Sequence, residues 1–141
     1  MKKVLGILIA LIVLSLWMPF NNSHQTLLAQ KGEWKAPAWA DTLKNPFPND
    51  AKAIQAGQKI YGQLCAICHG NTGKGDGVAG MALNPRPADL TSDKVQHQSD
   101  GAIYWKITTG RPPMASYKAS LTDEQRWQLV NYIRSLGKKK K

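Results

Sequence analysis

The chain has 141 residues and a mass of 15.5 kDa, enough for one compact domain and little more. Its 43% hydrophobic and 20% charged residues argue against general disorder, and two cysteines exclude a disulfide-rich scaffold. Six of the 19 basic residues lie at the two ends, which leaves 13 basic against 9 acidic residues for the rest, or +4. Basic residues are not clustered among aromatic ones, so we predict no nucleic-acid partner.

The first 29 residues are predicted to direct export. Lys2 and Lys3 precede an uncharged apolar stretch at residues 4–20, as in a secretory signal. Two outcomes stay open: cleavage after Ala29, or retention as a membrane anchor near the lower length limit for a spanning helix. No cysteine follows the stretch, which excludes a lipoprotein anchor. Both outcomes place the remaining chain in the periplasm or on the outer face of the cytoplasmic membrane.

Residues 30–49 form a predicted arm between the export segment and the domain. Its three prolines prevent a long helix, while Trp34, Trp39 and Phe47 are too apolar for a free linker. We favour an arm that packs its aromatic side chains on the domain, because exposed apolar groups tend to be covered. The alternative is an arm that reaches a partner subunit.

The domain itself is predicted to span residues 50–137 and to contain at least three helices. The first follows the N-cap Asp50 and covers about residues 51–63. The second is capped by Ser99 or Asp100 and runs to Thr109, before Gly110.

The third helix begins at Thr122, which forms a capping box with Gln125, and is expected to end at Gly137. Its apolar stripe consists of Trp127, Val130, Ile133 and Leu136. The loops at residues 70–91 and 110–120 show no strand signal and need something to organise them. Three short helices and two long loops make a poor hydrophobic core, and a large apolar cofactor would supply what is missing.

Both cysteines belong to one run, Cys65-Ala66-Ile67-Cys68-His69. A thioredoxin-type disulfide would need a strand–helix context, and zinc would need two further ligands at paired spacing; the sequence offers neither. Attachment of haem c accounts for every element. Cys65 and Cys68 would form thioethers with the haem, and His69 would be the proximal ligand of its iron.

Met114 is the predicted second axial ligand. It follows Gly110-Arg111-Pro112-Pro113, 45 residues after His69, and a loop stiffened by prolines can hold a thioether at the iron. The alternatives are Met81, in a glycine-rich loop, His97, or an open position. A methionine that merely fills the core, and a solvent-exposed His97, are the simpler interpretations of these residues.

Six short motifs share the order and spacing of one known family: Gly57-x-x-x-Tyr61, the run from Cys65 to His69, Gly75-Asp76-Gly77, Pro85-x-Pro87-Ala88-Asp89-Leu90, Gly110-Arg111-Pro112-Pro113-Met114 and Trp127-x-x-Val130-x-Tyr132-Ile133-Arg134. Over residues 50–137 the chain resembles a class I monohaem cytochrome c. The resemblance implies an all-α fold of short helices around one covalent haem c.

The resemblance also implies that the first and last helices cross at right angles, with Gly57 and Tyr61 against the face from Trp127 to Tyr132. A proline carbonyl, that of Pro85 or Pro87, would accept the Nδ1 proton of His69.

The predicted function is that of a one-electron carrier rather than an enzyme, because His and Met ligands leave no position for a substrate. The expected partners are redox proteins: a quinol-oxidising complex as donor and a terminal oxidase or reductase as acceptor. The alternative is a membrane-tethered cytochrome c subunit of a larger respiratory complex; a haem enzyme with an open iron position is a third.

Basic side chains are further candidates for docking. Lys74, Lys94, Lys106 and Lys118 would steer acidic partners, or are scattered solvated charges. The lysine tail at residues 138–141 is either a solubilising end or a contact with an anionic surface.

Overall fold

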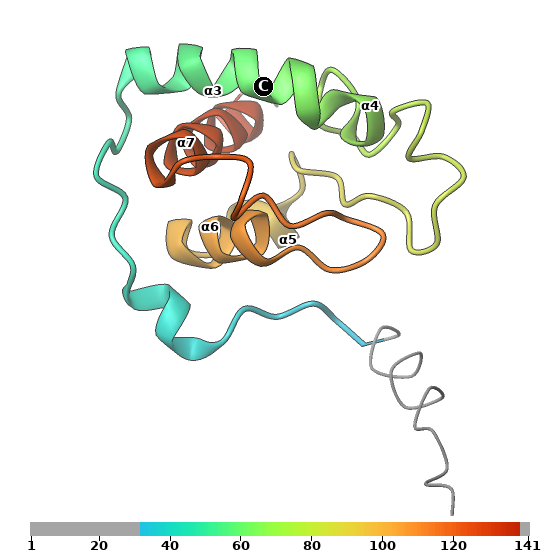
Figure 1. The fold of residues 1–141 in the computed structure, drawn as a ribbon, viewed down its shortest axis with the longest axis horizontal. Coiled ribbons are helices and arrows are strands. Elements are labelled where there is room, and N and C mark those ends of the chain that lie inside the picture. Colours follow the sequence, from blue (N-terminus) through green and yellow to red (C-terminus); the bar gives the residue numbers. More distant parts are fainter. Residues whose placement is uncertain (1–31, 139–141) are drawn as a thin grey trace, which may run out of the picture. The chain divides into compact units, whose positions relative to one another are not determined.

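A computed structural model describes residues 32–138 of the chain (Figure 1). Its helical elements are η1 (Ala38–Thr42), α3 (Ala51–Leu64), α4 (Ala66–His69), α5 (Asp93–Gln96), α6 (Asp100–Thr109) and α7 (Asp123–Lys138). Within the described residues the only β-type pairing is an isolated bridge between Arg111 and Met114, so the predicted all-α fold is confirmed.

The helical elements named above belong to one compact unit that begins at Lys35. None of the helices in the described part is long and apolar enough to cross a membrane. The predicted export segment at residues 1–29 and the tail residues 139–141 lie outside the described residues, so both remain predictions.

Helix α3 begins at the predicted cap: the Asp50 side chain accepts hydrogen bonds from the backbone N–H groups of Lys52 and Ala53. It packs across α7, as the ribbon in Figure 1 shows. Gly57 and Tyr61 provide the contact, because Gly57 lies against the α7 backbone and the Tyr61 ring lies 5.0 Å from that of Tyr132. The predicted pairing of the first and last helices is confirmed.

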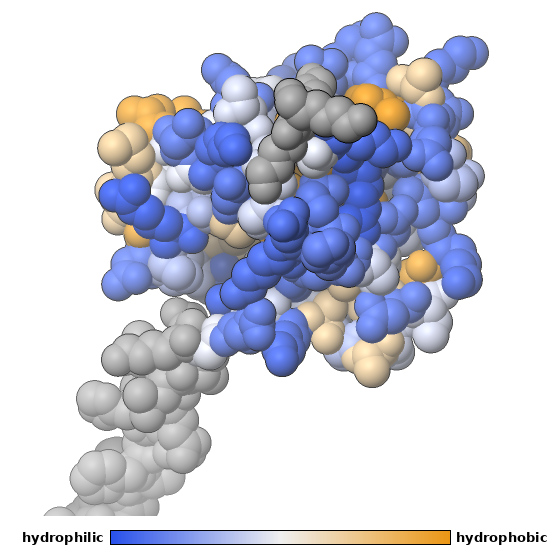
Figure 2. All heavy atoms as spheres, turned by 180° about the vertical axis from the view of Figure 1, so that it is seen from behind, coloured by the Kyte–Doolittle hydropathy of each residue, from blue (hydrophilic) through white to orange (hydrophobic). Residues whose placement is uncertain are grey.

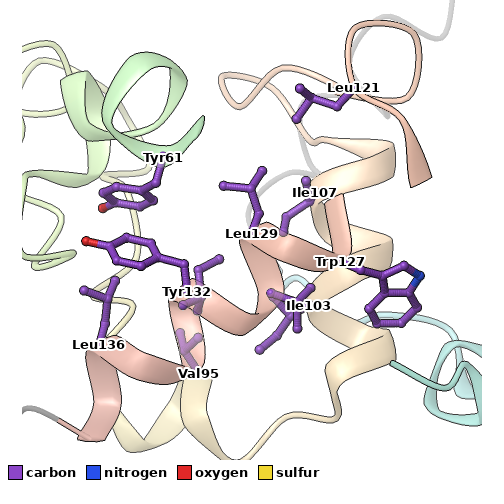
Figure 3. Packing of buried hydrophobic residues seen from close by; sticks show 11 residues of the cluster. Tyr61, Val95, Ile103, Ile107, Leu121, Trp127, Leu129, Tyr132 and Leu136 are labelled. Carbon is purple, nitrogen blue, oxygen red and sulfur yellow. The ribbon is translucent and has the colours of Figure 1, made fainter. Parts of the chain in front are cut away.

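The hydrophobic core lies between α3, α6 and α7, and Figure 3 shows its side chains meeting between these helices. All four residues of the predicted stripe on α7 are buried, and Val130 is fully enclosed. The buried face of α7 is nevertheless wider than the stripe, because Leu129 and Tyr132 also lie inside. It includes two polar side chains that the periodicity did not predict, Arg126 and Asn131.

Helices α6 and α7 also begin as predicted. Ser99 accepts a hydrogen bond from the Ala102 N–H, and Thr122 and Gln125 cap each other's backbone. The prediction that Gly137 ends α7 is wrong, since the helix continues through it to Lys138. A β-carbon at Gly137 would lie 2.5 Å from the Gln96 side chain, so this glycine permits close packing against α5.

Residues 38–47 of the arm are attached to the domain. Ala40 is fully buried, and Leu43 and Phe47 pack against the core. Asn45 donates hydrogen bonds to Asp100 at 2.8 Å and, more weakly, to Asn131. The prediction that the arm packs its aromatic side chains on the domain is therefore confirmed for Phe47. It is wrong for Trp39, which is 57% exposed because η1 turns its ring away from the domain while Ala40 faces inward.

Candidate cofactor site

The Cys-x-x-Cys-His run lies directly after α3 and forms the single turn α4. The backbone N–H groups of Cys68 and His69 both donate to the Cys65 carbonyl, at 3.1 and 2.8 Å. Cys65 and Cys68 are half-buried free thiols on this one turn. Burial, with a smaller contribution from Cys68, raises the pKa of the Cys65 thiol to about 12, which keeps it protonated.

The His69 ring is oriented by a backbone carbonyl on the loop that follows. Its Nδ1 lies 3.2 Å from the carbonyl oxygen of Ala88. Burial lowers the pKa of His69, and the contact with Ala88 opposes this effect. A neutral ring that donates through Nδ1 keeps its Nε2 lone pair available to a metal.

The expected partner of His69 was the carbonyl of Pro85 or Pro87, and that expectation is wrong by one residue. The Pro87 carbonyl faces Gly75 instead, where a β-carbon would lie only 2.5 Å from it. The next carbonyl along the chain, that of Ala88, therefore faces the imidazole.

A glycine-rich loop holds the motif from outside by backbone hydrogen bonds. Gly75 N–H donates to the His69 carbonyl, Gly77 N–H to that of Cys68, and Ala79 N–H to that of Ile67. Gly77 must be glycine, because a β-carbon would lie 2.4 Å from the Ile67 oxygen. The α4 carbonyls are thereby satisfied, and the two cysteines and the histidine are fixed relative to one another.

Met114 is half-buried and closes a tight turn of the second long loop. Its N–H and C=O pair with the C=O and N–H of Arg111, at 2.8 and 3.0 Å. Three residues later the Tyr117 hydroxyl donates to the Leu64 carbonyl, next to Cys65, at 3.2 Å. In Figure 1 this loop and the glycine-rich loop extend to the same side of the helices as α4.

Met81 and His97, the alternative candidates for the second axial ligand, lie in other segments than Met114. Met81 is 57% exposed in the glycine-rich loop, and its N–H donates to the Gly77 carbonyl, so its backbone belongs to the segment that holds α4. His97 is exposed at the C-terminal end of α5.

The chemistry of these side chains suits haem c. One turn offers two thiols for thioether bonds and an imidazole nitrogen for the iron, and a neighbouring loop offers a methionine sulfur. Within residues 32–138 no group of three or more His, Cys, Asp or Glu side chains could hold a metal ion, so the zinc alternative has no ligand set there.

Comparisons with known proteins agree with this chemistry. The sequence model of the family described as "Cytochrome C oxidase, cbb3-type, subunit III" matches residues 52–133, more than half of the chain. The chain is 29% identical over 94 residues to the Cbb3-type cytochrome c oxidase subunit CcoP of Azospirillum brasilense, covering 66% of this chain and 32% of CcoP. It is 26% identical over 106 residues to cytochrome c550 of Pseudomonas aeruginosa, covering 70% of this chain and 67% of that protein.

A solved structure is also similar. A chain of the reducing HAO-like protein complex of Kuenenia stuttgartiensis matches with a TM-score of 0.57 and 30% sequence identity, covering 77% of this chain and 53% of that one. The chain thus spans about a third of CcoP and about half of this structural relative. The family match, the helical fold and the two cysteines of the Cys-x-x-Cys-His run together establish that the chain belongs to the class I monohaem cytochrome c family, whose cofactor is a covalently bound haem c with its iron.

Proposed function

We propose that the protein is a one-electron carrier in which Cys65 and Cys68 bind haem c covalently and His69 and Met114 are its axial ligands. Bound haem c supplies a reversible one-electron couple at its iron. The observation that carries the proposal is the hydrogen bond from Tyr117 to Leu64, which joins the Met114 loop to the residue before the motif. His69 would supply a nitrogen donor and Met114 a sulfur donor, and this hydrogen bond joins the two segments that carry them.

The protein's own groups define the properties of this site. The Ala88 carbonyl fixes the His69 tautomer and the direction of its ring, and makes the imidazole a better electron donor. A methionine sulfur favours the reduced iron relative to a second imidazole, which raises the potential. With both axial positions filled, no position remains for a substrate, so we propose a carrier and not an enzyme.

Met81 and His97 are weaker candidates for the second ligand. Met81 is 57% exposed, and its backbone belongs to the loop whose N–H groups bond the carbonyls of Ile67, Cys68 and His69. His97 is exposed at the C-terminal end of α5. Met114 lies in a segment that contacts the residue before the motif from a distant part of the chain, through the Tyr117 bond to Leu64.

The proposed partners are redox proteins outside the cytoplasmic membrane: a quinol-oxidising donor complex and a terminal oxidase or reductase as acceptor. Export is proposed from the sequence of residues 1–29. Lys74, Lys94, Lys106 and Lys118 remain proposed docking charges. Lys74 lies 3.9 Å from Asp89, and Lys106 donates to Gln98.

A membrane-tethered subunit of a respiratory complex is the second candidate, favoured by the similarity to an oxidase subunit. The N-terminal sequence of the mature protein and its distribution between soluble and membrane fractions distinguish the two. A start near Gln30 in the soluble fraction supports the free carrier; an intact N-terminus in the membrane fraction supports the subunit.

Replacement of Met114 by alanine tests the carrier site. The ferric wild type should show the weak sulfur-to-iron charge-transfer band of methionine ligation, and Met114→Ala should lose the band, bind cyanide readily and have a lower potential. Met81→Ala and His97→Ala are the controls and should match the wild type. If the wild type lacks the band and binds carbon monoxide freely, the iron has an open position and the enzyme alternative replaces the carrier.

A further inference from the structure

The segment that follows Met114 is fastened at several points, which is unusual for a loop on the surface of a small domain. On one side Ser116 donates to the Thr108 carbonyl at 2.7 Å, and the Tyr117 N–H donates to the Ile107 carbonyl at 3.2 Å. These bonds attach the segment to the end of α6. They leave open what holds it against the Cys-x-x-Cys-His motif and against α7.

Tyr117 makes the connection to the motif. Its hydroxyl donates to the carbonyl of Leu64, a residue 53 positions earlier and adjacent to Cys65. The ring is half-buried, and this burial is the main cause that raises the pKa of Tyr117. The hydroxyl therefore keeps the proton that it donates.

Arg126 makes the connection to α7. The residue is 4% exposed, and one terminal nitrogen of the guanidinium donates to the carbonyls of Leu121 at 2.6 Å, Lys118 at 3.1 Å and, weakly, Tyr117 at 3.4 Å. The other terminal nitrogen donates to Asp123 and to the Tyr104 hydroxyl.

Burial of the Arg126 guanidinium costs free energy, which the bonds that it makes must offset. Its charge is removed from water and is paired with Asp123, while its Nε is buried without a hydrogen-bond partner among the described residues. The carbonyls that it satisfies belong to the segment after Met114, so the buried charge is used chiefly to hold that segment.

We propose that Tyr117 and Arg126 form a clamp that holds the Met114 segment against the motif and α7 and thereby slows the exchange of Met114 at the iron. The proposal rests on the proposed ligation by Met114. Neither residue is assigned a bond to the iron, so both are positioning residues. Opening of the segment must break the Tyr117 bond to Leu64 and the Arg126 bonds to the three carbonyls.

The test uses the ferric full-length protein with its haem, and imidazole as the competing ligand. Imidazole binds only after the methionine leaves, so its limiting binding rate reports the opening of the segment. Tyr117→Phe removes the bond to Leu64 and keeps the ring, and should raise this rate about fivefold, as loss of one hydrogen bond of ordinary net strength predicts. Tyr61→Phe is the matched control. It loses a 2.7 Å bond from a tyrosine hydroxyl to the Gly70 carbonyl on the His69 side, and should leave the rate unchanged.

A second pair of variants tests Arg126. Arg126→Gln removes several bonds to the segment and should raise the rate more than Tyr117→Phe does. Arg134→Gln is its control on the same helix, because Arg134 is also paired with an aspartate and donates to two backbone carbonyls, those of Gln96 and Gln98, away from the Met114 segment. Should Arg126→Gln fail to fold, the comparison of Tyr117→Phe with Tyr61→Phe still decides whether the clamp slows the opening of the Met114 segment.

Unfolding by urea, followed by far-ultraviolet circular dichroism, separates positioning from general stability. The clamp predicts that Tyr117→Phe and Tyr61→Phe lose similar global stability while only the former exchanges its methionine faster. Equal imidazole rates in these two variants would overturn the clamp while leaving Met114 as the ligand. A charge-transfer band that survives in Met114→Ala would instead remove the ligation and the clamp together.

Discussion

Gly57 lies so close to Gln128 that a β-carbon at position 57 would be 2.0 Å from the Gln128 carbonyl oxygen. That oxygen belongs to the backbone of α7, which cannot move without disturbing the core. We predict that Gly57→Ala lowers the free energy of unfolding by about 1–3 kcal/mol, even though alanine favours a helix by about 1 kcal/mol. Urea denaturation followed by circular dichroism measures the change.

Gly62 provides the matched control on the same helix. A β-carbon there would have no neighbour within 4 Å, so Gly62→Ala should raise the free energy of unfolding by up to about 1 kcal/mol. If the two variants changed stability in the same direction, close packing of α3 on α7 would not be the reason for glycine at position 57.

Much of the fold was predictable because the signals are local. Asp50, Ser99 and Thr122 each cap the helix that they were expected to cap, since the cap and the N–H groups it satisfies lie within three residues of one another. The stripe on α7 follows from helical periodicity in the same way.

What the sequence could not predict depends on contacts between distant residues. The carbonyl facing His69 is that of Ala88 and not of a proline, because Gly75 occupies the place beside Pro87. Gly137 resembles a helix terminator, and only its contact with Gln96 shows that the helix continues. The buried position of Arg126 likewise depends on carbonyls of a loop whose path no periodicity describes.

We predict that the position of the arm depends on the close contact between Gly101 and the backbone of Ala40. A β-carbon at Gly101 would lie 1.9 Å from the Ala40 carbonyl oxygen, so Gly101→Ala should displace η1 from α6 at a local cost of about 1–3 kcal/mol. The backbone N–H groups of Ala40 and Leu43 donate to the carbonyls of Pro37 and Ala40 at the two ends of η1, and their hydrogen exchange should then accelerate. Exchange in α3 should remain as slow as in the wild type; unchanged exchange in η1 would show that the arm is held elsewhere.

Alkaline pH is predicted to destabilise the protein through Tyr61. Burial is the main reason that the pKa of Tyr61 is raised above its ordinary value, so the folded protein keeps the hydroxyl neutral where the unfolded chain would ionise it. Its contribution is complete below the unfolded pKa of about 10 and is lost as the pH rises above that value.

Tyr61→Phe isolates this contribution. At neutral pH the variant should be about 1 kcal/mol less stable, because it lacks the hydrogen bond to the Gly70 carbonyl. Between pH 9 and about 11, the range around the tyrosine pKa, its free energy of unfolding should fall less steeply than that of the wild type. If the free energy of unfolding fell equally steeply with pH in the two proteins, the loss of stability at alkaline pH would belong to other groups. Tyr132 is one such group, because burial also raises its pKa.

The last prediction concerns the covalent attachment of the haem through Cys65 and Cys68. Both thiols lie free on one turn, so each can form a thioether independently of the other. Replacement of both cysteines by alanine should leave haem that acid–acetone extracts from the protein, whereas either single variant should retain haem through one bond. The pyridine haemochrome spectrum of a single variant should lie between those of a haem with two thioethers and one with none. Met114→Ala is the control, because loss of the axial sulfur should leave attachment complete. Retention of unextractable haem by the double variant would show that other residues bind the cofactor covalently.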